Sequence, residues 1–145
     1  MNDLTNTPSI EKIFQLEHEM RKFDDSEIIT KELDESINHY FAKGLYVREL
    51  FIPKGTLFTG KIHKTEHINI IPKGDITVWT ESGMQRLNGP HIFVSQPGTK
   101  RVGLAHEDTI WVNIHHTFET DLSKIELDLI QDEKLYLELK ELCLS

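Results

Sequence analysis

The sequence contains a single cysteine, Cys143, and no long apolar run. One cysteine excludes an internal disulfide framework and a zinc site built from cysteines. A transmembrane helix needs about 18 or more consecutive apolar residues, so we expect no span and no membrane partner. The N-terminal residues also lack the basic-then-apolar order of a secretory signal. These absences predict a cytoplasmic protein.

The sequence also lacks an excess of positive charge. Its formal net charge is −8, which argues against a general affinity for nucleic acid or anionic membranes. The charge is unevenly distributed, because residues 44–105 carry eight basic and only four acidic side chains. Either the flanks simply carry solvated acids, or the middle of the chain suits an anionic small molecule. Only that middle segment is a candidate anion site.

The length of 145 residues fits one domain, with helices expected at both ends. Apolar residues in 8–23 recur at helical spacing, and residues 27–43 are polar enough for a linker or a poor helix. We therefore assign residues 1–43 to an N-terminal helix and linker. Residues 118–145 return to helical spacing, with Asp121 or Ser123 as the N-cap. This C-terminal helix is expected to pack on the rest of the chain or on a second subunit in a homodimer.

Residues 44–117 have a different pattern, with about eight short runs rich in β-branched and aromatic residues. Turn sequences containing glycine or proline separate these runs, at residues 53–55, 72–74, 81–83, 88–90 and 96–98. No helical pattern lies between them. The segment is therefore predicted to be an all-β, antiparallel sandwich or barrel.

Histidines supply the strongest candidate site. His63 and His67 lie in a strand-like context, and alternation allows both side chains to face the barrel interior. Neutral imidazole suits a divalent transition metal, which is the candidate cofactor, and useful affinity needs a third ligand. His115 is the candidate third ligand if the polar residues of its strand face inward together with Asn113. The general rule that apolar faces are buried favours the opposite orientation, with His115 on the surface.

The residues around this pair resemble the first motif of the cupin family, in which two histidines, a glutamate and a glycine follow at fixed spacing. The stretch Lys61-x-His63-x-x-x-His67-x6-Gly74 keeps that spacing. Lys61 stands at the first histidine position and His67 at the glutamate position. The resemblance implies a cupin-type antiparallel β-barrel, a jelly roll, flanked by the N- and C-terminal helices.

The second cupin motif, a Pro-Gly turn followed by a histidine, is similar to residues 96–101, with Arg101 at the histidine position. Lysine and arginine do not bind metals in their charged forms, and inside a barrel each needs an anionic partner. The sequence also resembles small single-cupin proteins of unassigned role that are often encoded in bacteriophage genomes. That resemblance would place the protein in the host cytoplasm.

We interpret the chain as a cupin that binds a small anionic molecule in a positively charged pocket. The expected ligand-binding residues are Lys61, His63, His67, Arg86, Arg101 and Asn113. An alternative is a metal-dependent enzyme of the isomerase, hydrolase or dioxygenase type that uses His63, His67 and His115. A second alternative is a structural or accessory dimer with no ligand.

Overall fold

The computed structural model of the protein describes residue 11 and residues 37–130. The predicted N-terminal helix over 8–23, apart from residue 11, and the predicted C-terminal helix beyond residue 130 lie outside the described residues. Within the described part of the chain, no helix is long and apolar enough to cross a bilayer.

Residues 37–116 form nine strands. In chain order they are β1 (Ile37–Ala42), β2 (Leu45–Ile52), β3 (Leu57–Thr59), β4 (His67–Lys73), β5 (Asp75–Thr80), β6 (Gly83–Asn88), β7 (His91–Ser95), β8 (Val102–Ala105) and β9 (Thr109–His116). The eight strands from β2 to β9 confirm the eight predicted runs, although β3 is shorter than its run.

The strand β1 corrects the prediction of a linker or poor helix before residue 44. It pairs with β2 in antiparallel register, from Ile37 opposite Leu50 to Ala42 opposite Leu45. As an edge strand, β1 has almost all its side chains exposed. It therefore lacks the apolar alternation that identifies a half-buried strand in a sequence.

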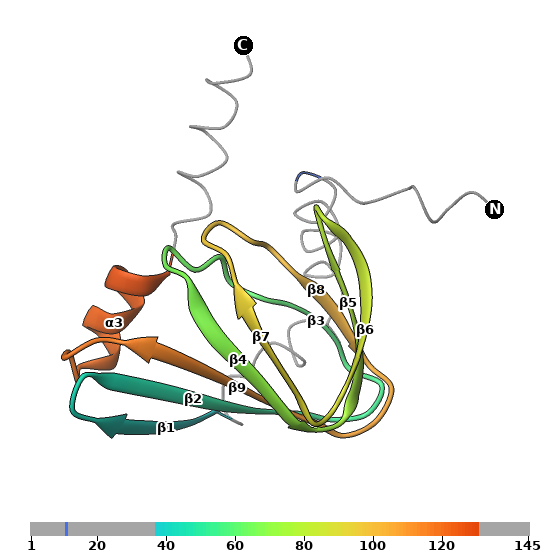
Figure 1. Ribbon diagram of the computed structural model, residues 1–145, viewed down its shortest axis with the longest axis horizontal. Coiled ribbons are helices and arrows are strands. Elements are labelled where there is room, and N and C mark those ends of the chain that lie inside the picture. The colour runs from blue at the N-terminus through green and yellow to red at the C-terminus, as the bar shows by residue number, and fades with distance from the viewer. Residues whose placement is uncertain (1–10, 12–36, 131–145) are drawn as a thin grey trace, which may run out of the picture.

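The strands form two antiparallel sheets that face each other (Figure 1). One sheet has the order β1-β2-β9-β4-β7, and the other has the order β3-β8-β5-β6. From β2 to β9 the chain changes sheet at every step except the hairpin between β5 and β6. Two four-stranded antiparallel sheets with this connectivity make a jelly roll, with β1 added at one edge. This topology confirms the predicted antiparallel jelly roll.

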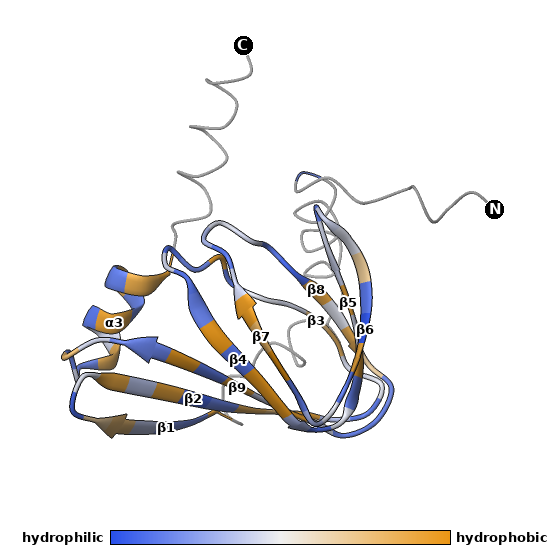
Figure 2. Ribbon diagram, viewed as in Figure 1, coloured by the Kyte–Doolittle hydropathy of each residue, from blue (hydrophilic) through white to orange (hydrophobic). Residues whose placement is uncertain are grey.

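The main hydrophobic core lies between the sheets. It consists of Ile52, Phe58, Ile71, Ile76, Val78, Leu87, Ala105 and Trp111. The strands that supply these residues alternate apolar and polar positions, as the bands of colour along β4 and β9 in Figure 2 show. The core occupies one part of the barrel interior, and polar side chains occupy the other part.

The connection from β4 to β5 depends on Gly74, in one of the predicted turns. Its φ of +135° lies in a region that side chains rarely adopt. A Cβ at this position would lie 2.3 Å from the Oγ1 of Thr109, far inside van der Waals contact. Glycine is therefore needed both for the turn and for the close approach of the start of β9.

The orientation of β9 is opposite to the one that the apolar-burial rule favours. Thr109, Trp111 and His115 are buried, whereas Ile110, Val112 and Ile114 are only partly buried, on the other face. That outer face of the five-stranded sheet is itself apolar, because Ile114 pairs with Ile68 and Val112 pairs with Ile70. Cross-strand pairs of β-branched residues stabilise the sheet without filling the barrel. His115 and Asn113 are therefore on the interior face of the sheet.

The helix α3 (Leu122–Leu129) follows β9 and lies beside β2 and β9 (Figure 1). Asp121, one of the two predicted caps, is its N-cap and accepts a hydrogen bond from the backbone N–H of Ser123 at 2.9 Å. Ile125 and Leu129 are buried against Tyr46 of β2. The helix thus packs on the barrel, and the homodimer stays a prediction.

Candidate metal site and pocket

The jelly roll brings three histidines from separate parts of the chain into contact. His67 lies at the start of β4, His115 near the end of β9, and His63 in the segment before β4. Their ring centroids are 4.4, 4.6 and 5.0 Å apart. One ligand nitrogen from each ring can be chosen so that all three lie within 4.8 Å of one another.

Strand register and two backbone contacts hold the rings in place. The pairing of Ile68 with Ile114 in β4 and β9 sets His67 and His115 side by side on the inner face. The backbone carbonyl of His63 accepts a hydrogen bond from the N–H of Gly98 at 3.0 Å. His63 also forms a bridge with Ile130, just after α3. The site therefore depends on tertiary pairing more than on local sequence.

Hydrogen bonding leaves several ring nitrogens available. The Nδ1 of His67 lies 3.2 Å from the backbone carbonyl of Thr65, which can accept only from a protonated nitrogen. This contact favours the tautomer with a free Nε2 on His67. Among the described residues, both ring nitrogens of His115 and the Nδ1 of His63 are buried without a hydrogen-bond partner. Leaving a buried polar atom unsatisfied costs about 1–3 kcal/mol, so these nitrogens call for a partner.

The electrostatic environment keeps the three imidazoles neutral. Burial, followed by the neighbouring histidines, lowers the pKa of His63 to about 2. Burial, followed by His67, lowers the pKa of His115 to about 3. Burial also lowers the pKa of His67. Neutral imidazole is the form that binds transition metals, so the cluster is ready to accept an ion at neutral pH.

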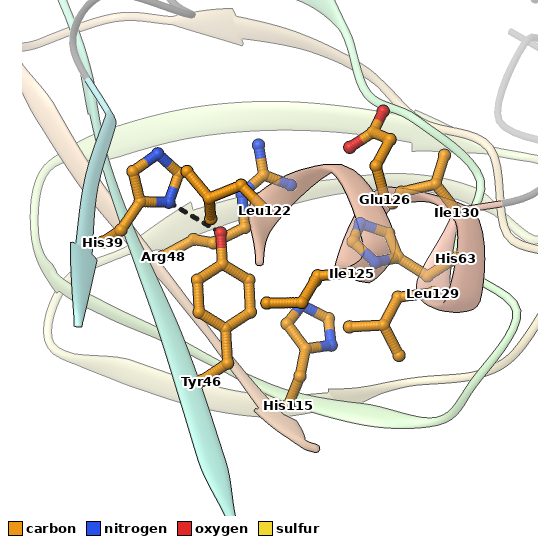
Figure 3. A pocket seen from close by; sticks show the side chains of 10 residues that line it. All are labelled: His39, Tyr46, Arg48, His63, His115, Leu122, Ile125, Glu126, Leu129 and Ile130. Atoms are coloured by element: carbon orange, nitrogen blue, oxygen red, sulfur yellow. Dashed lines mark hydrogen bonds between the residues drawn. The ribbon is translucent and has the colours of Figure 1, made fainter. Parts of the chain in front are cut away.

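A cavity of about 60 Å³ adjoins two of the three histidines. Figure 3 shows its lining residues: His39, Tyr46, Arg48, His63, His115, Leu122, Ile125, Glu126, Leu129 and Ile130. Its polar wall comes mainly from β1, β2 and the histidines, whereas its apolar wall comes from α3 and the residue after it. The hydroxyl of Tyr46 lies 2.7 Å from the Nδ1 of His39 in this wall. The cavity lining therefore combines an apolar surface from α3 with polar groups from both sides, because α3 also supplies the carboxylate of Glu126.

Two of the predicted ligand-binding residues lie away from the histidine cluster. The ammonium of Lys61 is half exposed and pairs with the carboxylate of Glu126 at 2.5 Å. Arg86 makes two hydrogen bonds to Asp75, at 2.8 and 2.7 Å, on the surface of the four-stranded sheet. Lys61 and Arg86 each form an ion pair with a carboxylate on a neighbouring element, and neither side chain points into the barrel.

Arg101 and Asn113 point inward but already have partners. A terminal nitrogen of Arg101 donates to the Oγ of Ser95 at 2.8 Å, and its guanidinium lies over the ring of Phe93. Burial lowers the pKa of Arg101. The side-chain amide of Asn113 donates to the Oδ1 of Asn69 at 2.6 Å. Neither lines the cavity, although the charge of Arg101 contributes to the lowered pKa values of His63 and His67.

Sequence reasoning missed four polar residues of the cavity: His39, Tyr46, Arg48 and Glu126. His39 falls in the segment predicted as linker, and Glu126 on a helix whose contacts were open. The signal for the other two was the alternation in β2, where Tyr46 and Arg48 share the face of the buried Ile52. That alternation shows which residues share a face, but it does not show which cavity they line.

Comparisons with known proteins add a likeness of fold. The sequence matches no protein-family model and no curated protein. Similar solved structures include a cupin-2 domain protein from Shewanella frigidimarina, with 12% identity and a TM-score of 0.47 over 57% of this chain and 80% of that chain. KdgF from Halomonas has 17% identity and a TM-score of 0.48, covering 60% of this chain and 83% of that one. EutQ from Clostridium difficile has 10% identity and a TM-score of 0.48, covering 58% and 68%. Because all three TM-scores are below 0.5, the fold assignment here depends on the strand topology.

Proposed function

We propose that the protein binds a divalent transition metal through His63, His67 and His115, and that the metal and the adjoining cavity bind a small anionic molecule. The observation that carries this proposal is the set of three neutral imidazoles in contact, two of them with buried nitrogens that lack any hydrogen-bond partner among the described residues. A metal ion takes one nitrogen from each ring, so it would satisfy one of the two buried nitrogens of His115 and leave the other as an N–H donor.

The chemistry of the three residues fits such an ion. Iron, nickel, zinc, copper and manganese all accept imidazole ligands, with metal–nitrogen bonds of about 2.0–2.1 Å in the case of zinc. Ligand nitrogens within 4.8 Å of one another approach that arrangement through small side-chain rotations. The Thr65 carbonyl orients His67, as outer hydrogen bonds commonly do for metal-binding histidines.

The residues of the cavity wall would surround a small molecule bound beside the metal. His63, His67 and His115 would hold the metal, and a bound ion would supply Lewis-acid polarisation of the oxygen atoms of a small molecule. Tyr46 and His39 share a hydrogen bond in the wall, between the phenol oxygen and Nδ1. Ile125 and Leu129 of α3 pack against Tyr46 of β2 and give the cavity apolar surface. The metal-dependent enzyme considered from the sequence would use this same site.

Metal binding is tested with protein purified without a histidine tag and stripped with a chelator. Titration with Co²⁺, followed by its visible absorption, is expected to show one strong site. His115→Ala is expected to weaken Co²⁺ binding at least 100-fold, beyond the roughly 10–100-fold effect of losing an outer-shell partner. The matched control is His116→Ala, because His116 is the next residue of β9 and is exposed on the other face.

Far-UV circular dichroism and urea unfolding check that both variants keep the fold. Equal Co²⁺ affinity in the two variants would contradict the proposed site. So would the absence of stoichiometric binding in the unsubstituted protein.

A further inference from the structure

We infer that the cavity takes a compact organic carboxylate, held between Arg48 and the metal on the three histidines. The inference depends on the proposed metal site and goes beyond it by naming the ligand class and the residue that selects it. Arg48 is one of the eight basic residues of the middle segment, but it was not among the expected ligand-binding residues.

Arg48 is a cation without an acidic partner. Its side chain is partly buried and lines the cavity on the inward face of β2 (Figure 3). Among residues 37–130 this side chain makes no hydrogen bond or ion pair. The carboxylate in the cavity wall belongs to Glu126, which pairs with Lys61. A partly buried cation in this setting is stabilised by an anion brought in from solvent.

The charge of the metal site strengthens this preference. Three neutral imidazoles leave the full +2 charge of a bound divalent ion, because the described group of ligands contains no carboxylate. The guanidinium of Arg48 adds another positive charge, while Lys61 and Glu126 neutralise each other. The loaded pocket therefore has a net charge of about +3 at short range, which favours anions strongly over neutral molecules.

The size of the cavity limits that anion. A cavity needs about 10–15 Å³ to hold one water molecule. The cavity of about 60 Å³ therefore holds roughly four to six atoms of that size. A carboxylate with a short carbon chain falls in this range. Nucleotides and sugar phosphates are several times larger and do not fit inside.

The apolar wall distinguishes a carboxylate from an inorganic oxyanion. Leu122, Ile125 and Leu129 of α3 and Ile130 after it supply this apolar wall, which also carries the carboxylate of Glu126 (Figure 3). Phosphate or sulfate has oxygens on every side, and those facing this wall would be left without hydrogen bonds. A short carboxylate instead directs its charged end to Arg48 and the metal, and its carbon chain to α3. The guanidinium fork also matches the two oxygens of a carboxylate.

The experiment uses Co²⁺-loaded protein and isothermal titration with propionate, inorganic phosphate and benzoate, whose ring exceeds the cavity. Propionate is expected to bind the unsubstituted protein more tightly than phosphate or benzoate. Arg48→Gln is expected to weaken propionate binding about 10- to 100-fold, the effect of losing a charge-assisted bidentate pair. The matched control is Arg86→Gln, because Arg86 pairs with Asp75 outside the cavity.

Co²⁺ absorption measured before each titration separates this inference from the proposed function. Failure of the unsubstituted protein to bind Co²⁺ overturns both. Normal Co²⁺ binding with equal propionate affinity in Arg48→Gln and Arg86→Gln overturns only the inference, and so does tighter binding of phosphate than of propionate. Arg48→Lys keeps the charge but not the fork, and its expected propionate affinity lies between those of the unsubstituted protein and Arg48→Gln. An Arg48→Lys affinity equal to that of the unsubstituted protein would contradict the bidentate contact.

Discussion

Mild acid should strongly destabilise the metal-free protein, because His63 and His115 must stay neutral in the folded barrel. Burial lowers the pKa of His63 to about 2 and that of His115 to about 3, from 6.5 for a histidine in an unfolded chain. A pKa that is depressed by folding contributes stability that is fully present above the unfolded value. That stability is lost progressively as the pH falls from 6.5 toward the folded values.

The size of the effect follows from these pKa values. At pH 5 each histidine is mostly protonated in the unfolded chain and neutral in the folded protein. The free energy of unfolding is then about 2 kcal/mol lower per histidine than at pH 7, or about 4 kcal/mol for both. Small domains have total stabilities of about 5–15 kcal/mol, so this is a large fraction. Because both folded values lie well below 5, a change of one unit in either hardly alters the result.

Urea unfolding at pH 7, 6 and 5 with a chelator present measures this free energy, with the fluorescence of the tryptophans as the signal. His115→Gln removes one titrating group and should reduce the loss between pH 7 and pH 5 by about 2 kcal/mol. His116→Gln is the matched control and should show the same loss as the unsubstituted protein, because His116 is exposed. Carboxylates are also protonated as the pH falls, but they affect His115→Gln and His116→Gln equally, so their contribution cancels in the difference between the two variants. An undiminished loss in His115→Gln would refute the reasoning.

Three further predictions concern the metal, the helix and one turn. Zn²⁺ should raise the thermal midpoint in a concentration-dependent way, because an ion that binds only the folded state stabilises it, and a chelator should reverse the shift; an unchanged midpoint would contradict the site. Ile125→Ala should lower the free energy of urea unfolding by about 2–4 kcal/mol, because Ile125 is buried between α3 and the barrel. Leu127→Ala, at a position 73% exposed, should change it by less than about 0.5 kcal/mol, and equal effects would contradict the packing. Gly74→Ala should lower it by more than about 2 kcal/mol, through the clash with Thr109 and the positive φ. Gly55→Ala, with a positive φ but open space, should lower it by only about 1–2 kcal/mol, and a larger effect than at Gly74 would contradict the contact.

Much of the barrel was predictable from local pattern. The runs between residues 44 and 117 became β2 to β9, because β-branched alternation and glycine turns are local properties of the chain. The N-cap at Asp121 was predictable for the same reason. The strand β1 was not, because an edge strand exposed along its length has no apolar face to identify it.

The candidate site was predictable only in part. Spacing along one strand pointed to His63 and His67, but His115 joins them through the register between β4 and β9. The apolar-burial rule placed His115 outside because it takes the barrel interior to be uniformly apolar. In the structure the apolar residues of β9 pair instead with those of β4 on the outer face of the sheet, leaving polar residues inside.

The residue types, the turns and the strand alternation of this chain already predict an antiparallel sandwich or barrel with histidines available to bind a metal, and the resemblance to the cupin motifs implies the jelly roll. Those features act between neighbours in sequence, so they can be read one segment at a time. Packing between segments that are distant in sequence determines which charged side chains line the pocket. Lys61 forms an ion pair with Glu126, and Arg86 forms one with Asp75. Arg48 instead lies in the cavity wall, because β2 pairs with β9 and α3 packs beside them. Coulomb pairing and strand register depend on distance in space, which a one-dimensional pattern does not contain.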